Sequence, residues 1–326
     1  MPPIRHVVRE ALVGTLFRRN CVLPLATGRR FVFLFHDISP ESEPHHHRNY
    51  SVSPGVFFRQ IQVLRELFAL VSLDTLCDRD NRSPSNQAAV VFDDGFLSVS
   101  TLAAPHLSAQ GIPFAVFANQ KALEEGRLWC SDVVLGLNDD QYLRSLYERY
   151  TDHGISYEIF AQAPLDHLIS SPQLRDDYDG FGDRPPGAVR VYLNSAELQG
   201  LKRGGAVVGS HTVSHPVMER LSGVHAGTEI EQNKDYLESL LQAEIRHFAF
   251  PFGFPGTFNR ETEALARSHH RFLYTTNRAF FKPTDLTMGG LLLPRIGLRN
   301  EGRPEILATV NAAFFVNRLN QIRMMN

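Results

Sequence analysis

Two adjacent carboxylates and two histidines four residues apart are the side chains of this chain best suited to chemistry. Asp93 and Asp94 follow the apolar run 88–92, and the histidines are His211 and His215. Neighbouring side chains on an extended strand point to opposite faces, so we expect one carboxylate to hold an ion and the other to handle a proton. The alternative is a strand end capped by an Asp-Asp-Gly turn.

The spacing of the two histidines permits them to share a metal ion. One turn of helix brings residues i and i+4 to the same face, so we predict that His211 and His215 lie side by side on a helical turn. Imidazoles placed in this way can bind one divalent ion together. A pair of structural or exposed histidines is the alternative that the spacing alone leaves open.

The position of these residues in the chain favours the metal site. His36, the two carboxylates and the histidine pair each come directly after an apolar run typical of a buried parallel strand. The carboxyl ends of parallel strands converge at one face of a barrel. One carboxylate and two imidazoles with open positions form a catalytic metal set. Zn²⁺ suits these ligands best, and Co²⁺ or Ni²⁺ are the alternatives.

The order of the predicted elements indicates an α/β protein with a mainly parallel sheet or barrel. Apolar β runs alternate with helical patterns up to residue 118, including a short strand predicted at 71–73. The alternation stops between about 121 and 192, which we interpret as an inserted subdomain, and then resumes. The spacing in 194–197 is that of a capping box and predicts the start of a helix.

The chain divides into three predicted parts. Residues 1–28 form an amphipathic N-terminal helical segment. This segment either docks on the rest of the protein or rests on a membrane surface. Residues 29–300 form the barrel with its insertion, and residues 301–326 form a C-terminal helix.

Composition and charge exclude several classes of function. The 326 residues are 43% apolar and 21% charged, which is ordinary for a soluble globular protein. A net charge of −2 gives no indication of the basic surface that binds nucleic acid. No apolar run approaches the roughly 20 residues that span a bilayer. The three cysteines and an N-terminus without an apolar core favour a cytoplasmic protein, with peripheral contact with the inner membrane as an added option.

Three motifs together resemble the signature of the polysaccharide deacetylase family, the fourth family of carbohydrate esterases. They are Phe-Asp-Asp-Gly at 92–95, His-Thr-Val-Ser-His at 211–215 and Phe-Pro-Phe-Gly at 250–253. The segments 35–39 and 293–296 are similar to the branch of poly-N-acetylglucosamine deacetylases. The resemblance implies a distorted (β/α) barrel of the polysaccharide deacetylase type, with fewer strands than a regular eight-stranded barrel.

The resemblance also implies roles for individual residues. Asp94, His211 and His215 would bind the metal, and Asp93 would be the general base that takes a proton from the attacking water. The backbone N–H of Phe252, just beyond Pro251, would help to hold the oxyanion.

The general acid is where the chain departs from the family pattern. The chain has no histidine after His270, and the family's usual Asp-Trp element is missing. The branch with a His-Asp pair on the first strand implies His36 as the acid, and a buried structural histidine is the alternative. Arg295 is expected to pair with Asp93 and keep it ionised, with a structural salt bridge elsewhere as the alternative.

The function implied by these residues is metal-dependent hydrolysis of the acetamide of an N-acetylated amino sugar in a glycan or glycoconjugate. Two other functions stay open. One is a non-catalytic carbohydrate-binding protein on the same barrel, which the missing elements favour. The other is an amide hydrolase for a small non-sugar substrate, because a fold does not determine its substrate.

Overall fold

The structure, a computed structural model, describes residues 28–47, 50–151, 154–171, 190–287, 292–299 and 301–324. The helical segment predicted for 1–28 therefore lies outside the described residues, except for its last position. Part of the predicted insertion, 172–189, also lies outside them.

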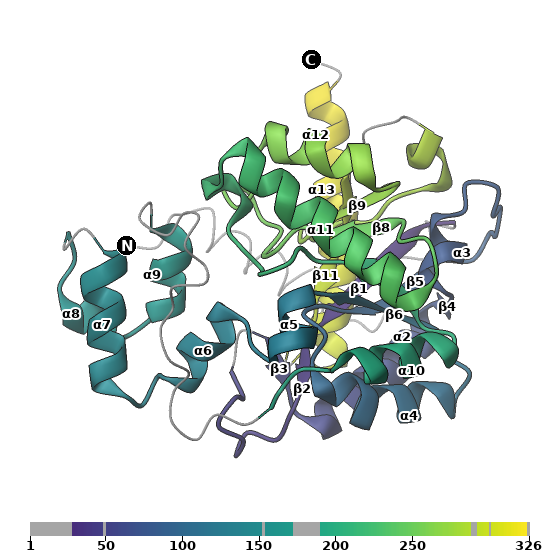
Figure 1. The fold of residues 1–326 in the computed structure, drawn as a ribbon. Helices are drawn as coiled ribbons and strands as arrows, with labels where there is room; N and C mark the ends of the chain where they lie inside the picture. The colour runs from purple at the N-terminus through teal and green to yellow at the C-terminus, as the bar shows by residue number, and fades with distance from the viewer. Residues whose placement is uncertain are drawn as a thin grey trace.

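A nearly closed barrel of parallel strands forms the centre of the molecule (Figure 1). Its strands are β1 (Arg30–Phe35), β5 (Gln87–Phe92), β6 (Phe114–Ala118), β7 (Val207–Ser210), β8 (His247–Ala249), β9 (Phe272–Thr275), β10 (Leu292–Pro294) and β11 (Ile296–Gly297). Their order around the barrel is β10-β9-β8-β7-β6-β5-β1-β11, and every neighbouring pair is parallel. The predicted α/β barrel is confirmed.

The barrel closes through one chain segment that is interrupted at a single residue. Strands β10 and β11 lie at the two ends of the strand order, and only Arg295 separates them in the sequence. The backbone N–H of Arg295 donates to the carbonyl of Thr275 at 2.9 Å, which keeps the segment on β9 before it crosses to β1. Seven chain segments thus supply the described barrel strands, fewer than in a regular eight-stranded barrel.

Alternating side chains on each strand fill two different cores. On β1, Val32 and Leu34 belong to the cluster inside the barrel, whereas Phe31, Phe33 and Phe35 pack outward against the helices. All five are at most 2% exposed. Burial on both faces explains why the strand sequences are continuous apolar runs rather than alternating ones.

Helices cover the outer face of the barrel. They are α2 (Pro54–Leu67), α4 (Ala104–Ser108), α10 (Ser195–Arg203), α11 (Gly223–Leu241), α12 (Arg260–His269) and α13 (Arg303–Met324). The short helix α3 (Leu73–Cys77) instead packs Leu73, Leu76 and Cys77 into the cluster inside the barrel. A π-helical turn, η1 (Val99–Ala103), leads into α4, and 3-10 turns lie at Met218–Arg220 and Pro283–Thr287. The capping box predicted at 194–197 is confirmed, because Asn194 and Glu197 each bond the backbone of the other.

The predicted short strand at 71–73 is wrong in its position. The strand in this region, β4, spans Ala69–Leu70 and pairs with β5, and α3 already begins at Leu73. Ser72 caps that helix by accepting from the backbone N–H of Thr75, which ends the extended segment earlier than its apolar residues indicate. A second short pair, β2 (Asp37–Ile38) and β3 (Ser51–Val52), continues the chain after β1.

Five of the described helices lie between β6 and α10, in the region predicted as an insertion. They are α5 (Gln120–Glu125), α6 (Trp129–Leu135), α7 (Asp140–Tyr150), α8 (Tyr157–Phe160) and α9 (Pro164–Ser170). Figure 1 shows α7, α8 and α9 to one side of the barrel, with α6 nearer to it. None of the helices described is both long and apolar enough to span a bilayer.

Candidate metal centre

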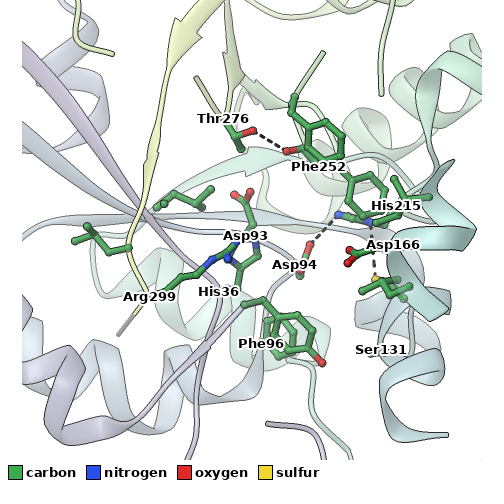
Figure 2. A pocket seen from close by; sticks show the side chains of 18 of the residues that line it. His36, Asp93, Asp94, Phe96, Ser131, Asp166, His215, Phe252, Thr276 and Arg299 are labelled. Atoms are coloured by element: carbon green, nitrogen blue, oxygen red, sulfur yellow. Dashed lines mark hydrogen bonds and ion pairs between the residues drawn. The ribbon is translucent and has the colours of Figure 1, made fainter. Parts of the chain in front are cut away.

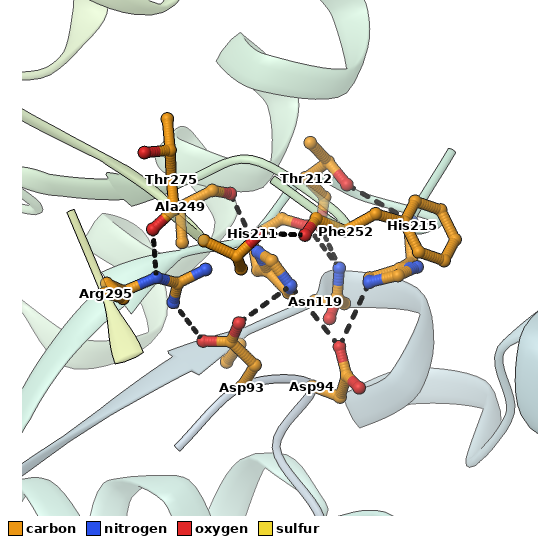
Figure 3. A network of polar contacts seen from close by, with 12 residues as sticks. Asp93, Asp94, Asn119, His211, Thr212, His215, Ala249, Phe252, Thr275 and Arg295 are labelled. Carbon is orange, nitrogen blue, oxygen red and sulfur yellow. Dashed lines mark hydrogen bonds and ion pairs between the residues drawn. The ribbon is translucent and has the colours of Figure 1, made fainter. Parts of the chain in front are cut away.

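Asp94, His211 and His215, which we call the metal triad, converge at the carboxyl end of the barrel (Figure 3). Each offers one ligand atom, and these atoms all lie within 4.8 Å of one another. Asp94 Oδ1 lies 3.4 Å from Nε2 of His211 and 3.3 Å from Nε2 of His215. All three side chains are buried, with residue exposures of 5%, 1% and 5%.

The two histidines do not lie on a helical turn, so that part of the prediction is wrong. They follow β7 in a loop, where Thr212 and His215 have φ values of 71° and 59°. These left-handed residues reverse the chain, so the loop rather than helical periodicity brings the imidazoles together. The i, i+4 spacing indicated the right pair for the wrong geometric reason.

Two other loops at this site also contain residues with left-handed backbone. Asp94 has φ 65° after β5, and Phe252 has φ 60° after β8. Four of the five non-glycine residues with positive φ in the described chain lie in this site, the fifth being Gln242 at the end of α11. Such residues cost free energy and cluster where a site requires a particular geometry.

Buried polar side chains hold the histidine loop. Asn119, directly after β6, donates from Nδ2 to the backbone carbonyls of His211 and Thr212, the latter at 2.9 Å. Ser214 donates from its backbone N–H and its hydroxyl to the carboxylate of Glu229 on α11, at 2.9 and 2.6 Å. The loop is therefore fixed from two sides of the barrel.

Asp93 continues the inward alternation of β5 and pairs with Arg295 at the closing segment. The distance from Arg295 Nη1 to Asp93 Oδ1 is 2.6 Å, and both residues are at most 2% exposed. The other carboxylate oxygen, Oδ2, faces the triad and lies 3.6 Å from Nε2 of His211. Both carboxylates approach Nε2 of His211, but only Asp93 pairs with Arg295, so the expected Asp93–Arg295 pair is present.

The electrostatics of the metal-free triad favour the protonation states of metal ligands at Asp94 and His215, whereas those at His211 favour its protonated form. Burial lowers the pKa of His215 to about 4, although Asp94 opposes this shift. Burial alone would raise the pKa of Asp94, but the imidazoles of His215, His211 and His36 outweigh it and hold that pKa well below its ordinary value. Burial opposes protonation of His211, and the carboxylates of Asp93 and Asp94 outweigh it and raise its pKa.

The residues of the triad fit a divalent ion. Asp94 Oδ1 is buried and accepts no hydrogen bond within the described chain, although the Nε2 atoms of both histidines face it. Nδ1 of His211 lies 2.7 Å from the carbonyl of Ala249, which makes Nδ1 the protonated nitrogen and leaves Nε2 as a ligand. An ion among these atoms would satisfy the orphaned oxygen.

The loop after β8 presents the backbone of Phe252 to the same site. Thr276 donates to the carbonyl of Phe252 at 2.9 Å, and Gly253 donates to the carbonyl of Pro251 at 2.6 Å. In the described chain no acceptor is found for the backbone N–H of Phe252. The ring of Phe252 packs edge-on against His215, with centroids 4.6 Å apart.

A cavity of about 380 Å³ opens onto these groups (Figure 2). His36, Asp93, Asp94, His215 and Phe252 line it, and His211 and Arg295 lie behind them as buried supports. Burial lowers the pKa of His36, and Asp94 and Asp93 oppose the shift. Aromatic walls with a few convergent polar groups are typical of a small-molecule site.

The motifs in the sequence did not identify two residues that hold the histidine loop in place. Asn119 directly follows the apolar run 112–118, so the rule that identified His36 and Asp93 could have found it. Trp129 on α6 donates from its indole N–H to the carbonyl of His215 at 2.8 Å, and its ring lies 6.0 Å from that of Phe252. No sequence signal connects it with the site.

Solved structures share this fold. The Streptococcus pyogenes deacetylase PplD, solved in complex with acetate, is 19% identical, with a TM-score of 0.59 over 87% of this chain and 99% of that protein. IcaB from Ammonifex degensii is 20% identical, with a TM-score of 0.57 over 86% and 97%. A de-N-acetylase from Aggregatibacter actinomycetemcomitans is 12% identical, with a TM-score of 0.55 over 84% and 96%.

Sequence comparison supplies the family. No curated protein matches the chain. The family model described as polysaccharide deacetylase matches residues 80–271, more than half of the chain, and this range contains Asp93 and the whole metal triad. The chain belongs to the polysaccharide deacetylase family.

Proposed function

We propose that this protein is a metal-dependent N-deacetylase that hydrolyses the acetamide of an N-acetylated amino sugar in a glycan or glycoconjugate. The observation that carries the proposal is the metal triad lying next to the Asp93–Arg295 pair on one cavity. Family membership supports this reaction class. The PplD structure holds acetate, which is the product that this reaction would release.

The triad would hold the ion through one carboxylate oxygen and two imidazole nitrogens, and Zn²⁺ is the ion that we propose. When bound, such an ion supplies Lewis acidity toward a carbonyl oxygen and toward water.

Asp93 is the proposed general base. Arg295 binds its Oδ1 atom, so Oδ2 is the oxygen that faces the triad and can take a proton from the attacking water. The backbone N–H of Phe252 is the proposed donor to the oxyanion that forms as water adds to the carbonyl carbon.

His36 is the proposed donor to the departing amine. Because its pKa is lowered, the imidazole is neutral in the free protein near pH 7. We therefore propose that His36 relays the proton that Asp93 has taken up, so that the C–N bond breaks to leave acetic acid and a neutral amine. Figure 2 shows His36 beside Asp93 and Asp94 in the cavity.

The first test is acetate release from N-acetylhexosamine conjugates by metal-free protein to which Zn²⁺, Co²⁺ or Ni²⁺ is added back. We expect Asp93→Asn to retain the metal and to lose turnover by at least about 100-fold, the usual contribution of a general base. A fully active Asp93→Asn protein would refute the mechanism. Wild-type protein that binds metal and sugar but releases no acetate would instead support the carbohydrate-binding alternative.

The role of His36 needs a substrate with a better leaving group. We expect His36→Gln to slow hydrolysis of the sugar amide strongly but to slow hydrolysis of 4-nitrophenyl acetate much less, because a nitrophenolate departs without a proton. Equal losses on both substrates would show that His36 is not the proton donor.

A further inference from the structure

Two arginines line the cavity in addition to the catalytic groups. Arg278 and Arg299 are exposed at the cavity wall, and neither guanidinium forms an ion pair with a described residue. The carboxylates at the base of the cavity do not neutralise them, since Asp93 is paired with Arg295 and Asp94 belongs to the metal triad. Two positive charges are thus available to a ligand in the cavity.

Both arginines are carried on anchored backbone. A buried glutamine on α2, Gln60, donates from Nε2 to the carbonyls of Arg299 and Glu301, at 2.5 and 2.8 Å. The loop of Arg278 is held at one end by Thr276, whose N–H donates to the carbonyl of Gly253 at 2.8 Å. At its other end, Phe281 exchanges backbone hydrogen bonds with Arg30.

The charges in the cavity are separated in space. Arg299 follows β11 and Arg278 follows β9, so both come from the part of the barrel where the strand order closes. Asp166 on α9 lines the cavity from the helices between β6 and α10, and Figure 2 shows Asp94 between Arg299 and Asp166. A ligand that reaches the metal triad can therefore place an anionic substituent at the arginine side only.

We propose that Arg278 and Arg299 form a phosphoryl subsite, so that the N-acetylated sugar hydrolysed here carries a phosphate ester or diphosphate. This inference rests on the proposed function. Guanidinium groups bind phosphate oxygens through paired hydrogen bonds, and a phosphoryl group offers enough oxygens and charge for two arginines. The phosphoryl group can belong to a free sugar phosphate, a nucleotide sugar or a lipid-linked sugar.

The test compares kcat/KM for matched substrates. The probes are the methyl glycoside of an N-acetylhexosamine, its 1-phosphate, its nucleoside diphosphate ester and its 1-phosphodiester with a short isoprenoid alcohol. We expect each phosphoryl substrate to exceed the neutral glycoside by about tenfold or more, the usual worth of a hydrogen bond to a charged group. The order among the three phosphoryl substrates then identifies the source of the phosphoryl group.

Substitutions assign the preference to the two arginines. We expect Arg278→Gln and Arg299→Gln each to reduce the ratio of phosphoryl to neutral kcat/KM by about tenfold. The matched control is Arg260→Gln, which removes the same charge from an exposed position at the start of α12, outside the cavity, and should leave the ratio unchanged. A wild-type protein without the preference, or a double variant that keeps it, would overturn the inference.

Failure of the subsite and failure of the proposed function are distinguishable. Hydrolysis of the neutral glycoside at the same rate as the phosphates would leave the deacetylase proposal intact and remove the subsite. If no probe is hydrolysed, the subsite can still be tested by binding. Calorimetry then measures the affinity of the N-acetylhexosamine 1-phosphate for the wild-type protein and for the double variant. Equal affinities overturn the subsite, and a loss of at least about tenfold in the variant supports it.

Discussion

Trp129, on the first turn of α6, donates a hydrogen bond of 2.8 Å from its indole N–H to the backbone carbonyl of His215. A helix from the region between β6 and α10 therefore contributes directly to the position of His215. His215 has left-handed backbone, so its carbonyl and side chain depend on a partner that fixes the loop.

The first prediction concerns this hydrogen bond. Trp129→Phe keeps an aromatic ring beside Phe252 but removes the N–H donor to His215. We expect the affinity for Zn²⁺ or Co²⁺ to fall by about 10–100-fold, as for other groups that orient metal ligands. Calorimetric titration of metal-free protein measures the change.

A matched control lies in the same group of helices between β6 and α10. Tyr147 on α7 donates from its hydroxyl to the carbonyl of Ile155 at 2.7 Å, away from the triad. Tyr147→Phe should leave the metal affinity within about twofold of wild type. If Trp129→Phe has equally little effect, the indole hydrogen bond does not position His215.

The second prediction concerns Asn119, which anchors the other end of the histidine loop. Asn119→Asp preserves the shape of the side chain but replaces the donor to the carbonyls of His211 and Thr212 with an acceptor. We expect at least about a tenfold loss of metal affinity. Gln120→Ala is the control, because that side chain donates to the exposed Glu124 instead. Unchanged metal binding in Asn119→Asp would contradict the anchoring role.

The third prediction is a double-mutant cycle across the buried ion pair. Arg295→Met leaves the Asp93 carboxylate buried without its cation, so we expect it to lower the free energy of unfolding by about 3–5 kcal/mol. Adding Asp93→Asn removes that charge and should recover part of the loss. Urea unfolding of the two single variants and the double variant measures the coupling.

An exposed ion pair provides the comparison for this cycle. Arg144 and Asp140 lie 2.7 Å apart on α7, with side chains 56% and 67% exposed. Arg144→Met should cost no more than about 0.5 kcal/mol. Additive effects of Asp93→Asn and Arg295→Met would show that the buried pair is not coupled.

The fourth prediction is a pH dependence of stability that originates away from the site. His270 is 5% exposed and its ring lies 5.0 Å from that of Phe248. Burial is the main cause that lowers its pKa to about 3, with a smaller contribution from Lys234. The unfolded chain takes up a proton near pH 6.5, whereas the folded protein does not, so folding becomes less favourable as the pH falls below 6.5.

His270→Phe should remove this dependence. Lowering the pH from 7 to 5 should destabilise the wild type by up to about 2 kcal/mol more than the variant, as the linkage relation gives for such a pKa difference. Urea unfolding at the two pH values measures this, with His225→Phe as the exposed control on α11. Identical pH dependences in wild type and His270→Phe would contradict the prediction.

The sequence by itself determined the barrel and brought out the three residues of the metal triad as candidate ligands. Apolar runs that end in Asp93-Asp94 or lead to His211 are local patterns, and strand alternation within such a run decides which carboxylate points inward. The capping box at Asn194 and Glu197 is equally local, because its partners are three residues apart. Features of this kind depend on neighbouring residues, so they are visible without the fold.

The tertiary structure decided how those ligands are oriented. His211 and His215 meet through a loop with left-handed residues, and Trp129 reaches His215 across 86 positions of sequence. Asp93 and Arg295 are 202 positions apart, and they meet because the segment containing Arg295 closes the barrel. Contacts at such separations depend on the packing of all the intervening elements, which no local pattern of the chain records.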